Sequence, residues 1–597
     1  MHQFIKISLL LSAFYCHSVY TEEWFETGNF YQIYPRSFMD SNGDGIGDLN
    51  GIKSKLEYLH DLGMDGVWLS PIYKSPNADF GYDISDFRDI HELFGSLDDF
   101  DKLVQECNRL GLKLILDFVP NHSSDEHDWF KRSESKESGY EDFYIWRDPK
   151  IDEISNIPVP PNNWMSTFRY SAWKWSEVRK QMYYHMFHYK QPDLNYRNPK
   201  VVQEMKDVLT YWLDRGVAGF RIDAVPSLFE DESLRDEPRS YRTDCDQFDH
   251  CSLQNIYTED QKETYDMVQQ WRKHLDEYSA VKNVSKKVIM VESYAKLDYN
   301  MLYYGNESAP GAHFPFNFEL IKRANINSTA EDYKSIVEEW LTAMPKGNIA
   351  NWVLGNHDNH RLASRLGEKR GDLLNFLLQT LPGAAITYQG EELVMSDVYL
   401  TWNETVDPQA CNSNPTIYES RSRDPARTPF PWDNTKNAGF STANKTWLPV
   451  GNNYKTVNVK AQQEAKDSHL KIFKKLTSIR KKEIFKKGDY LSALSNNKQV
   501  YSYKRQYQNE MAIVVLNFGI SQEIVNLTEL FKEIPSQLEV YVTSLDSGII
   551  SGSKIETSKV RIPGSHAIIL VKSAAGMIKA NILMIFVSSL VYFIFRN

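Results

Sequence analysis

Residues 219–225 read GFRIDAV, a short apolar run that contains two charged side chains. The run predicts a buried β-strand, on which Arg221 and Asp223, two residues apart, point to the same face. A buried ion pair would explain both charges and would indicate no function. The alternative is that this face opens into a site that needs an ionised carboxylate. The rest of the sequence decides between the two.

Seven further apolar runs alternate with helical patterns in the same way. They cover residues 31–35, 66–71, 113–120, 288–293, 313–318, 349–358 and 383–392. Strands that alternate with helices predict parallel βα units, and eight such units predict an α/β protein with a closed (β/α)8 TIM barrel. Most runs end in polar residues, among them Asp117, Asp223, Glu292 and Asp358. Because the C-terminal strand ends of a barrel ring one mouth, we expect these side chains to lie together.

Two segments break the regular alternation. Residues 123–190 contain many aromatic residues and prolines and predict a subdomain inserted after the third strand. Residues 490–572 contain short alternating segments, which predict a C-terminal antiparallel β-sandwich domain. The catalytic barrel is then expected over residues 21–122 and 191–487.

Both ends of the chain carry apolar segments. Residues 1–20 combine a lysine, a short apolar run and small residues, which predicts a secretory signal peptide rather than an uncleaved anchor. Residues 573–597 combine small residues, a short spacer and an apolar tail. This pattern favours a glycosylphosphatidylinositol (GPI) anchor signal, with a short membrane span as the alternative. We therefore expect a protein of the extracellular face of the plasma membrane, tethered by its C-terminus.

Charge and cysteine content restrict the partners and the compartment. The net charge of -11 argues against a nucleic-acid partner, because phosphate binding needs a basic surface. Cys245 and Cys251 are close enough to form a small disulfide loop in an oxidising compartment, or else are free thiols, and Cys107 is expected to be buried and unpaired. Glycosylation sequons open at Asn283, Asn306, Asn327, Asn403, Asn444 and Asn526.

The carboxylates at the strand ends indicate a reaction. Glycoside hydrolysis needs two carboxylates that face each other, one as nucleophile or base and one as acid. Arg221 is expected to lower the pKa of Asp223 and keep it ionised, whereas the apolar run before Glu292 is expected to raise the pKa of that glutamate. His122 and His357 could donate hydrogen bonds to sugar hydroxyls, or each could be a buried structural histidine.

Several motifs together resemble a known family. DFVPNH (117–122), GFRIDAV (219–225), VES (291–293) and NHD (356–358) are similar, in this order, to the four signature regions of the α-amylase family of glycoside hydrolases. QPDLN (191–195), GYDISDF (81–87) and SRDPARTPFPWD (422–433) resemble its α-glucosidase and oligo-1,6-glucosidase branch, in which the membrane-associated gut maltases of insects look most similar.

The resemblance implies a role for each matching residue. Asp223 would be the nucleophile, Glu292 the acid/base and Asp358 the stabiliser of the transition state. Supporting hydrogen bonds would come from Arg221, His122 and His357, and the non-reducing glucose would be held by Asp79, Tyr82 and Arg427. The sequon at Asn121 overlaps this site, so we expect it to carry no glycan.

The stretch DSNGDGIGD (40–48) predicts a cation site. Asp40, Asn42, Asp44 and Asp48 supply oxygen atoms at alternate positions on a tight loop, as Ca²⁺ requires. The twelfth position is Gly51 rather than the glutamate of an EF-hand. The resemblance implies calcium bound with the help of the Ile46 carbonyl, in a structural role, and a turn without a cation is the alternative. No organic cofactor is expected.

The sequence thus predicts an exo-acting, retaining α-glucosidase that acts on small oligosaccharides with α-1,4-linked glucose, including maltose and also sucrose. Alternatives are an isomaltose- or sucrose-preferring enzyme, a transglucosidase, or a non-catalytic relative such as the heavy chains of amino-acid transporters. All three carboxylates and Arg221 are present, which favours an enzyme. In the family a small residue after the nucleophile accompanies α-1,4 cleavage, and Ala224 is small.

Overall fold

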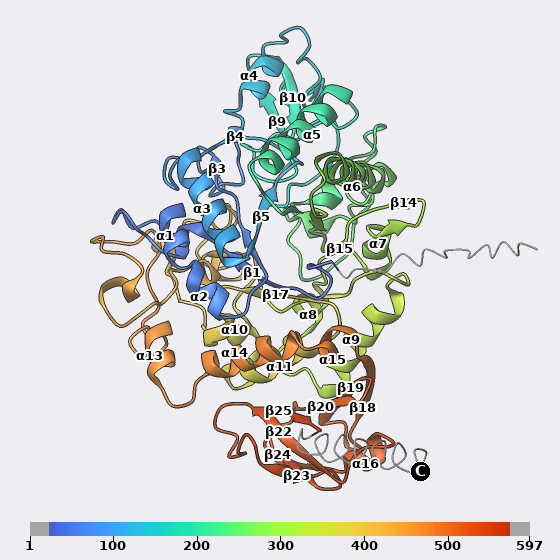
Figure 1. The fold of residues 1–597 in the computed structure, drawn as a ribbon. Coiled ribbons are helices and arrows are strands. Elements are labelled where there is room, and N and C mark those ends of the chain that lie inside the picture. The colour runs from blue at the N-terminus through green and yellow to red at the C-terminus, as the bar shows by residue number, and fades with distance from the viewer. Residues whose placement is uncertain (1–22, 573–597) are drawn as a thin grey trace, which may run out of the picture.

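The computed structural model describes residues 23–572, which form a barrel, an inserted segment and a C-terminal sheet (Figure 1). Eight parallel strands make one sheet in the order β15-β12-β11-β5-β2-β1-β17-β16. They are β1 (Asn29–Ile33), β2 (Gly66–Leu69), β5 (Lys113–Phe118), β11 (Gly219–Ile222), β12 (Val288–Val291), β15 (Phe314–Pro315), β16 (Asn351–Val353) and β17 (Ala384–Tyr388). All eight predicted strands are present.

The two end strands of this sheet, β15 and β16, are joined by a side chain. Asn351 Nδ2 donates a hydrogen bond to the Pro315 carbonyl (2.7 Å), and the Asn317 amide donates one to Asn351 Oδ1 (2.8 Å). The sheet therefore closes on itself, and the predicted barrel is confirmed. The close pairing of β11 with β12 also explains the glycine that opens GFRIDAV. A Cβ atom at Gly219 would lie 2.2 Å from the Val288 carbonyl oxygen.

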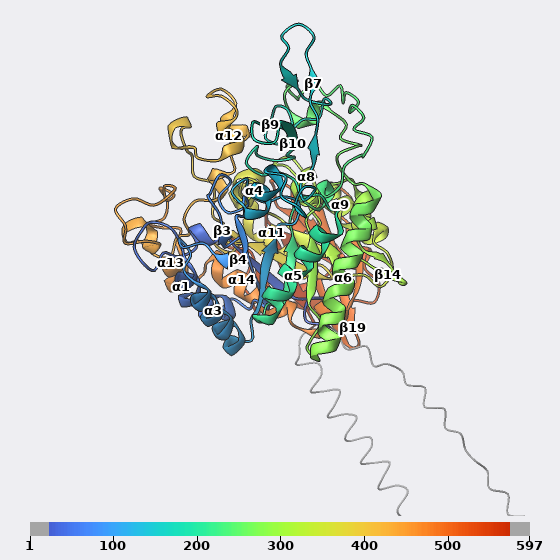
Figure 2. The same ribbon diagram turned by 90° about the horizontal axis from the view of Figure 1, so that it is seen from above.

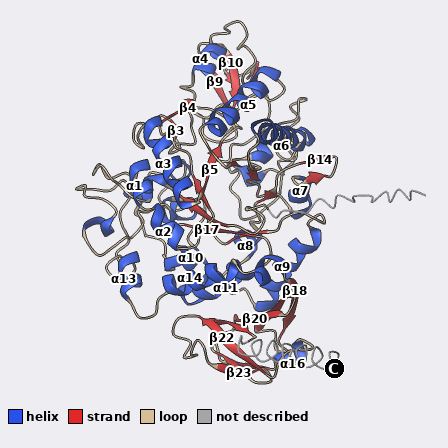
Figure 3. Ribbon diagram, in the orientation of Figure 1, coloured by secondary structure: helices blue, strands red, loops and turns tan. Residues whose placement is uncertain are grey.

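Helices surround the barrel (Figure 3). The main ones are α1 (Leu49–Ser54), α2 (Leu56–Asp61), α3 (Leu97–Leu110), α5 (Pro199–Asp214), α6 (Lys262–Lys282), α9 (Ala330–Ala343), α11 (Gly371–Thr380) and α14 (His469–Arg480). Local signals set several of their ends: Ser96 and Asp99 form a capping box at the start of α3, and Gly111 (φ 75°) ends that helix. Apolar side chains fill the barrel interior, including Phe30, Trp68, Ile115, Met290, Phe314, Val353 and Ile386. A packed interior leaves the mouth as the place for a site.

The segment between β5 and α5 has a small sheet and core of its own. Its strands β6 (Trp146–Arg147), β10 (Gln181–Tyr184) and β9 (Trp173–Ser176) pair antiparallel, next to the short helix α4 (Asp128–Glu134). Trp164, Trp173 and Met186 are buried together in this segment. Figure 2 shows it above the barrel, with the hairpin of β7 (Lys150–Ile151) and β8 (Pro158–Val159) at its tip. The domain boundaries at residues 123 and 190 stay predictions.

The C-terminal part is an antiparallel sheet domain. Its six strands are β18 (Asp489–Leu494), β19 (Val500–Tyr507), β20 (Glu510–Asn517), β25 (Ala567–Val571), β22 (Gln537–Thr543) and β23 (Lys554–Glu556), and a second layer pairs β21 (Glu523–Val525) with β24 (Val560–Ile562). One face of the large sheet shares an apolar core with α9, α11 and α14. Arg505 on β19 is buried and donates to the Thr380 carbonyl (2.8 Å) at the C-terminus of α11, where the helix dipole favours a cation.

The structure tests the predictions made for the cysteines but not those made for the two ends of the chain. The predicted signal peptide and anchor signal lie outside the described residues. Within residues 23–572 no helix is both long and apolar enough to cross a membrane. Cys245 and Cys251 form a disulfide, as one of the two alternatives predicted, and Cys107 is buried and free.

Candidate active site

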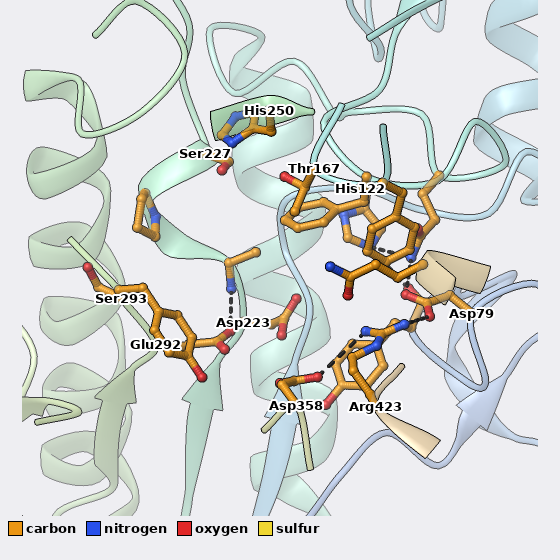
Figure 4. A pocket seen from close by; sticks show the side chains of 18 of the residues that line it. Asp79, His122, Thr167, Asp223, Ser227, His250, Glu292, Ser293, Asp358 and Arg423 are labelled. Carbon is orange, nitrogen blue, oxygen red and sulfur yellow. Dashed lines mark hydrogen bonds and ion pairs between the residues drawn. The ribbon is translucent and has the colours of Figure 1, made fainter. Parts of the chain in front are cut away.

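A cavity of about 370 Å³ opens at the C-terminal ends of the strands (Figure 4). Seven of the predicted site residues line it: Asp79, Tyr82, His122, Asp223, Glu292, His357 and Asp358. Asp223 and Glu292 directly follow β11 and β12, and Asp79 and Tyr82 lie on the loop between β3 (Tyr73–Lys74) and β4 (Asp86–Ile90). The inserted segment adds Thr167, Phe168 and Phe187 as a wall.

Arg221 lies under this cavity and contacts three carboxylates. It is 1% exposed. Its Nη1 atom lies 2.6 Å from Asp117 Oδ1 and 2.6 Å from Asp223 Oδ1, and its Nη2 atom lies 2.7 Å from Glu292 Oε2. The Trp68 ring lies 5.1 Å below the guanidinium. Arg221 and Asp223 therefore share a face because that face is the floor of the cavity.

This cluster carries more negative than positive charge, which alters the pKa of its members. Burial raises the pKa of Asp223 well above its usual value; Arg221 opposes the rise, and Glu292 and Asp117 add to it. Burial likewise raises the pKa of Asp117 to about 6, against the attraction of Arg221. Arg221 thus acts to lower the pKa of Asp223, as predicted, but the expected net lowering is wrong, because burial and two neighbouring carboxylates outweigh one cation.

Glu292 is held by the turn that follows Asp223. Ala224 has a left-handed backbone (φ 48°), which residues with a side chain seldom adopt. The turn places the Ala224 amide 3.1 Å from Glu292 Oε2, to which it donates a hydrogen bond. Together with Arg221 Nη2, this amide orients the Glu292 carboxylate toward Asp223. The buried Arg221 therefore holds both carboxyl groups, and the Ala224 amide adds a second contact to Glu292.

Asp358 is placed among cationic groups. Arg427 Nη2 lies 2.9 Å and Arg423 Nη1 3.5 Å from Asp358 Oδ1. Burial favours the protonated form of Asp358, but these permanently charged neighbours outweigh it and hold its pKa well below the usual value. Burial lowers the pKa of His357 well below its usual value, so its imidazole is neutral. Gln32 contacts one nitrogen of that ring (2.8 Å) and the Tyr82 hydroxyl contacts the other (2.7 Å).

One side of the cavity is lined by a residue that the sequence reasoning did not single out. Arg423 lies in the quoted motif 422–433, and its Nη2 atom lies 2.7 Å from Asp79 Oδ1 and 2.6 Å from Asp407 Oδ1. It lines the cavity, whereas the predicted Arg427 is fully buried behind Asp358. Gln191 Nε2 links Asp79 (3.3 Å) to His122 (3.1 Å). Asp407 belongs to no motif, and only the tertiary structure identifies it.

His122 and Asn121 occupy adjoining buried positions. Burial lowers the pKa of His122 to about 3, so that its ring is neutral and can accept or donate one hydrogen bond on each side. Asn121 is 1% exposed, and its Nδ2 donates to Asp193 Oδ2 (3.0 Å). That this sequon carries no glycan stays a prediction.

The predicted cation loop, residues 40–48, packs against residues 440–447. The Asp40 carboxylate accepts hydrogen bonds from the amides of Gly43 (2.7 Å) and Gly45 (2.8 Å) and from the Ser441 hydroxyl (2.5 Å). Asp48 caps α1 through the Gly51 amide (2.7 Å). In the part of the chain that the structure describes, no group of three or more acidic, histidine or cysteine side chains is placed to hold a metal ion. The donor chemistry, oxygen atoms only, fits Ca²⁺.

Comparisons with known proteins agree with this arrangement. Residues 32–488 match the family model described as "Alpha amylase, catalytic domain". The chain is 51% identical over 545 residues to Maltase A1 of Drosophila melanogaster, covering 90% of this chain and 94% of that protein. It is 54% identical over 527 residues to Salivary alpha-glucosidase of Aedes aegypti, with coverage of 87% and 90%. The crystal structure of the alpha-glucosyl transfer enzyme XgtA superposes with a TM-score of 0.80 at 31% identity, covering 93% of this chain and 100% of that one. With its ordered motifs, its barrel and its carboxylates at one mouth, the chain belongs to the α-amylase family of glycoside hydrolases.

Proposed function

We propose that the protein is an exo-acting, retaining α-glucosidase that releases terminal α-1,4-linked glucose from maltose, malto-oligosaccharides and sucrose. One observation carries the proposal: Asp223, Glu292 and Asp358 line a single cavity in which Asp79 and Arg423 form an ion pair. We infer that this pair closes one end of the cavity, which then accepts the last sugar of a chain and stops the chain from passing through. Relatives named maltase and alpha-glucosidase support the same activity.

In the first step the Asp223 carboxylate attacks the anomeric carbon of the terminal glucose, and Glu292 gives its proton to the glycosidic oxygen as the leaving sugar departs. In the second step Glu292 removes a proton from water, and the resulting nucleophile displaces Asp223 from the same carbon. Two inversions retain the α configuration. Asp358, kept ionised by Arg423 and Arg427, stabilises the positive charge that develops on the sugar.

The contacts of Arg221 support the roles of Asp223 as nucleophile and of Glu292 as acid/base. Asp223 and Glu292 contact different nitrogen atoms of one guanidinium, which favours the separation of about 5–5.5 Å that retaining enzymes use. Two carboxylates so close disfavour each other's ionisation, and the neighbouring Glu292 adds to the raised pKa of Asp223. In the proposed reaction Glu292 gives a proton to the leaving sugar when the substrate occupies the cavity. The His122 and His357 rings line the cavity as neutral imidazoles, so they do not compete with Glu292 as proton donors.

The test is to measure initial rates of the purified enzyme on maltose, sucrose, isomaltose and trehalose, and to follow maltose hydrolysis by proton NMR. We expect maltose to be cleaved fastest and α-glucose to appear before mutarotation. Release of β-glucose first would exclude the retaining mechanism. Asp223→Asn should abolish turnover without loss of the folded state, as judged by its thermal transition.

Transfer to an acceptor sugar is the second candidate, favoured by the likeness to the alpha-glucosyl transfer enzyme XgtA. In that reaction a sugar hydroxyl replaces water in the second step, and the ratio of oligosaccharide products to free glucose measures it. Preference for isomaltose or sucrose is a variant of the same chemistry. Ala224, which follows the nucleophile, favours α-1,4 linkages by analogy with the family. A non-catalytic role, like that of transporter heavy chains, is disfavoured because all catalytic carboxylates meet in one cavity.

The loop of Asp40, Asn42, Asp44, Asp48 and the Ile46 carbonyl is proposed to hold a structural Ca²⁺ ion. The ion would stabilise the contact between this loop and residues 440–447, which include Ser441. A chelator should lower the thermal midpoint, because a ligand bound only to the folded state stabilises it by mass action, and Asp44→Ala should remove that sensitivity. Metal analysis showing no calcium in the native enzyme would contradict the proposal.

We further propose that the enzyme is glycosylated and carries a GPI anchor on the extracellular surface. The proposal rests on the sequons and on the terminal segments, since the apolar tail, residues 582–595, is shorter than the roughly 20 residues that a spanning helix needs. Phosphatidylinositol-specific phospholipase C should release active enzyme from membranes. If the activity stays with the membrane while a control GPI-anchored protein is released, the tail is a span.

A further inference from the structure

Three segments that are distant in sequence meet at the rim of the cavity, and each contributes residues that line it. The first rim segment is 166–170 of the inserted region, with Thr167 and Phe168. The second is 245–252, between β11 and α6, with His250. The third is 409–423, after β17, with Gln409 and Arg423. Figure 4 shows His250 and Ser227 on the opposite side of the cavity from Asp79 and Arg423.

One buried carboxylate joins the three rim segments. Asp249 is 2% exposed and belongs to the second segment. Its Oδ2 atom accepts a hydrogen bond from Arg421 Nη2 of the third segment at 2.5 Å. Its Oδ1 atom lies 3.1 Å from Arg169 Nε of the first segment. Arg169 also lies 3.0 Å from Asp246 Oδ1, so that two arginines and two aspartates form one network.

The first segment also contacts the second through its backbone and through an aromatic pair. Arg169 and Tyr170 both have positive φ values, 75° and 66°, which such side chains disfavour and which neighbours must therefore hold in place. The Tyr170 amide donates to the Phe248 carbonyl (2.9 Å), and the two rings lie 5.6 Å apart. Phe168, two residues earlier, is thus positioned by the second segment.

The second segment is itself closed by the Cys245–Cys251 disulfide, which brackets Asp249. The Ser240 hydroxyl donates to the Cys251 carbonyl at 2.6 Å and fastens the base of the loop. A short covalent loop restricts the conformations available to its residues. The disulfide therefore holds the Asp249 carboxylate where both arginines reach it.

We propose that Asp249 is a positioning residue that ties the three rim segments together and thereby shapes the site for the leaving sugar. The proposal rests on the function proposed above. In the glucose site Arg423 is held by its ion pairs with Asp79 and Asp407, and its contact with the first rim segment is limited to the Phe168 ring, 5.1 Å from its guanidinium. The rim around His250 and Thr167, on the side where the leaving or acceptor sugar lies, is held by Asp249. Its ligand class is a hexose unit in the leaving or acceptor position.

The test separates the two halves of the site by substrate. Maltose fills both, whereas α-glucosyl fluoride, whose leaving group is a single atom, fills only the glucose site. For Asp249→Asn we expect the KM for maltose to rise by between about tenfold and a hundredfold, since small displacements of a positioning wall have effects of this size. The kcat for maltose and both constants for α-glucosyl fluoride should change less than about twofold, because the reacting groups are untouched.

Asp244→Asn is the matched control, because Asp244 directly precedes the disulfide loop, is exposed and pairs with Arg242 at 2.7 Å outside the network. It should behave like the wild type on both substrates. If Asp249→Asn does not fold, Arg421→Gln removes one of the two pairs at a more exposed position and should change the maltose KM in the same direction. An unchanged maltose KM, or equal losses on both substrates, would overturn the proposal. If the proposed function itself is wrong, the wild-type enzyme will be inactive on both maltose and α-glucosyl fluoride, an outcome that differs from either result for Asp249→Asn.

Discussion

Replacement of Asp117 by asparagine tests whether Arg221 is shared by three competing carboxylates. Asp117 Oδ1 and Asp223 Oδ1 each lie 2.6 Å from the same Arg221 nitrogen, so these oxygens are at most about 5 Å apart. Two unit charges at this distance interact by about 3 kcal/mol at an effective dielectric constant of 20. This corresponds to about 2 pKa units. Arg221 partly neutralises this repulsion, and protons redistribute among the three carboxyl groups. We therefore expect the apparent pKa to shift by about 1–2 units.

The sign of the shift follows from the charges. Asp117→Asn removes a negative neighbour from the Asp223–Glu292 pair, and a carboxyl group with less negative charge nearby loses its proton at lower pH. The alkaline limb of the kcat/KM profile for maltose, where the general acid becomes deprotonated, should move to lower pH by that amount. The limb is measured from pH 4 to 9 with maltose and with α-glucosyl fluoride, whose fluoride leaving group depends little on acid catalysis.

Two outcomes would refute this reasoning. An alkaline limb that stays in place would mean that the charge of Asp117 does not act on the group whose titration sets this limb. A limb that moves to higher pH would mean that Arg221 changes position when it loses Asp117 as a partner, and that this change outweighs the removal of a negative charge. Asp244 is exposed and pairs with Arg242 rather than with Arg221, so the Asp244→Asn control should leave the pH profile unchanged.

Three further predictions concern acid catalysis, the closed end of the cavity and the core. Glu292→Gln should lower kcat/KM for maltose by about 10²–10⁴-fold and for α-glucosyl fluoride far less; equal losses would exclude Glu292 as the acid. Arg423→Lys keeps the positive charge but cannot bond Asp79 and Asp407 at the same time. The KM should therefore rise by about 10–150-fold on both substrates, which corresponds to about 1.5–3 kcal/mol. An effect on maltose alone would place Arg423 outside the glucose site. Leu377 on α11 is fully buried in the core that this helix shares with the C-terminal sheet. Leu377→Ala should therefore lower the free energy of unfolding by about 2–5 kcal/mol in a denaturant titration, and a change below about 1 kcal/mol would contradict the packing described.

The barrel and the positions of the catalytic carboxylates could be predicted from the sequence because their signals are local. Each strand is a short apolar run, and its last residues point into the mouth whatever the neighbouring strands are. The spacing of Arg221 and Asp223 already places both on one face. The family motifs add the order of the strands, and the eight predicted runs all form strands of one sheet. The short sequence separation of Cys245 and Cys251 likewise allowed a disulfide to be predicted as one of two alternatives.

The closed end of the cavity was decided by the tertiary structure. Asp79, Asp407 and Arg423 come from loops that lie more than 300 residues apart at their extremes, and no local pattern indicates that one guanidinium joins both aspartates. The same holds for Asp249, whose two arginines come from the inserted segment and from the loop after β17. The sign of the pKa shift of Asp223 was also misjudged from sequence. One cation beside a carboxylate lowers its pKa, but burial and two further carboxylates reverse the balance, and only the folded chain determines how many charges share one arginine.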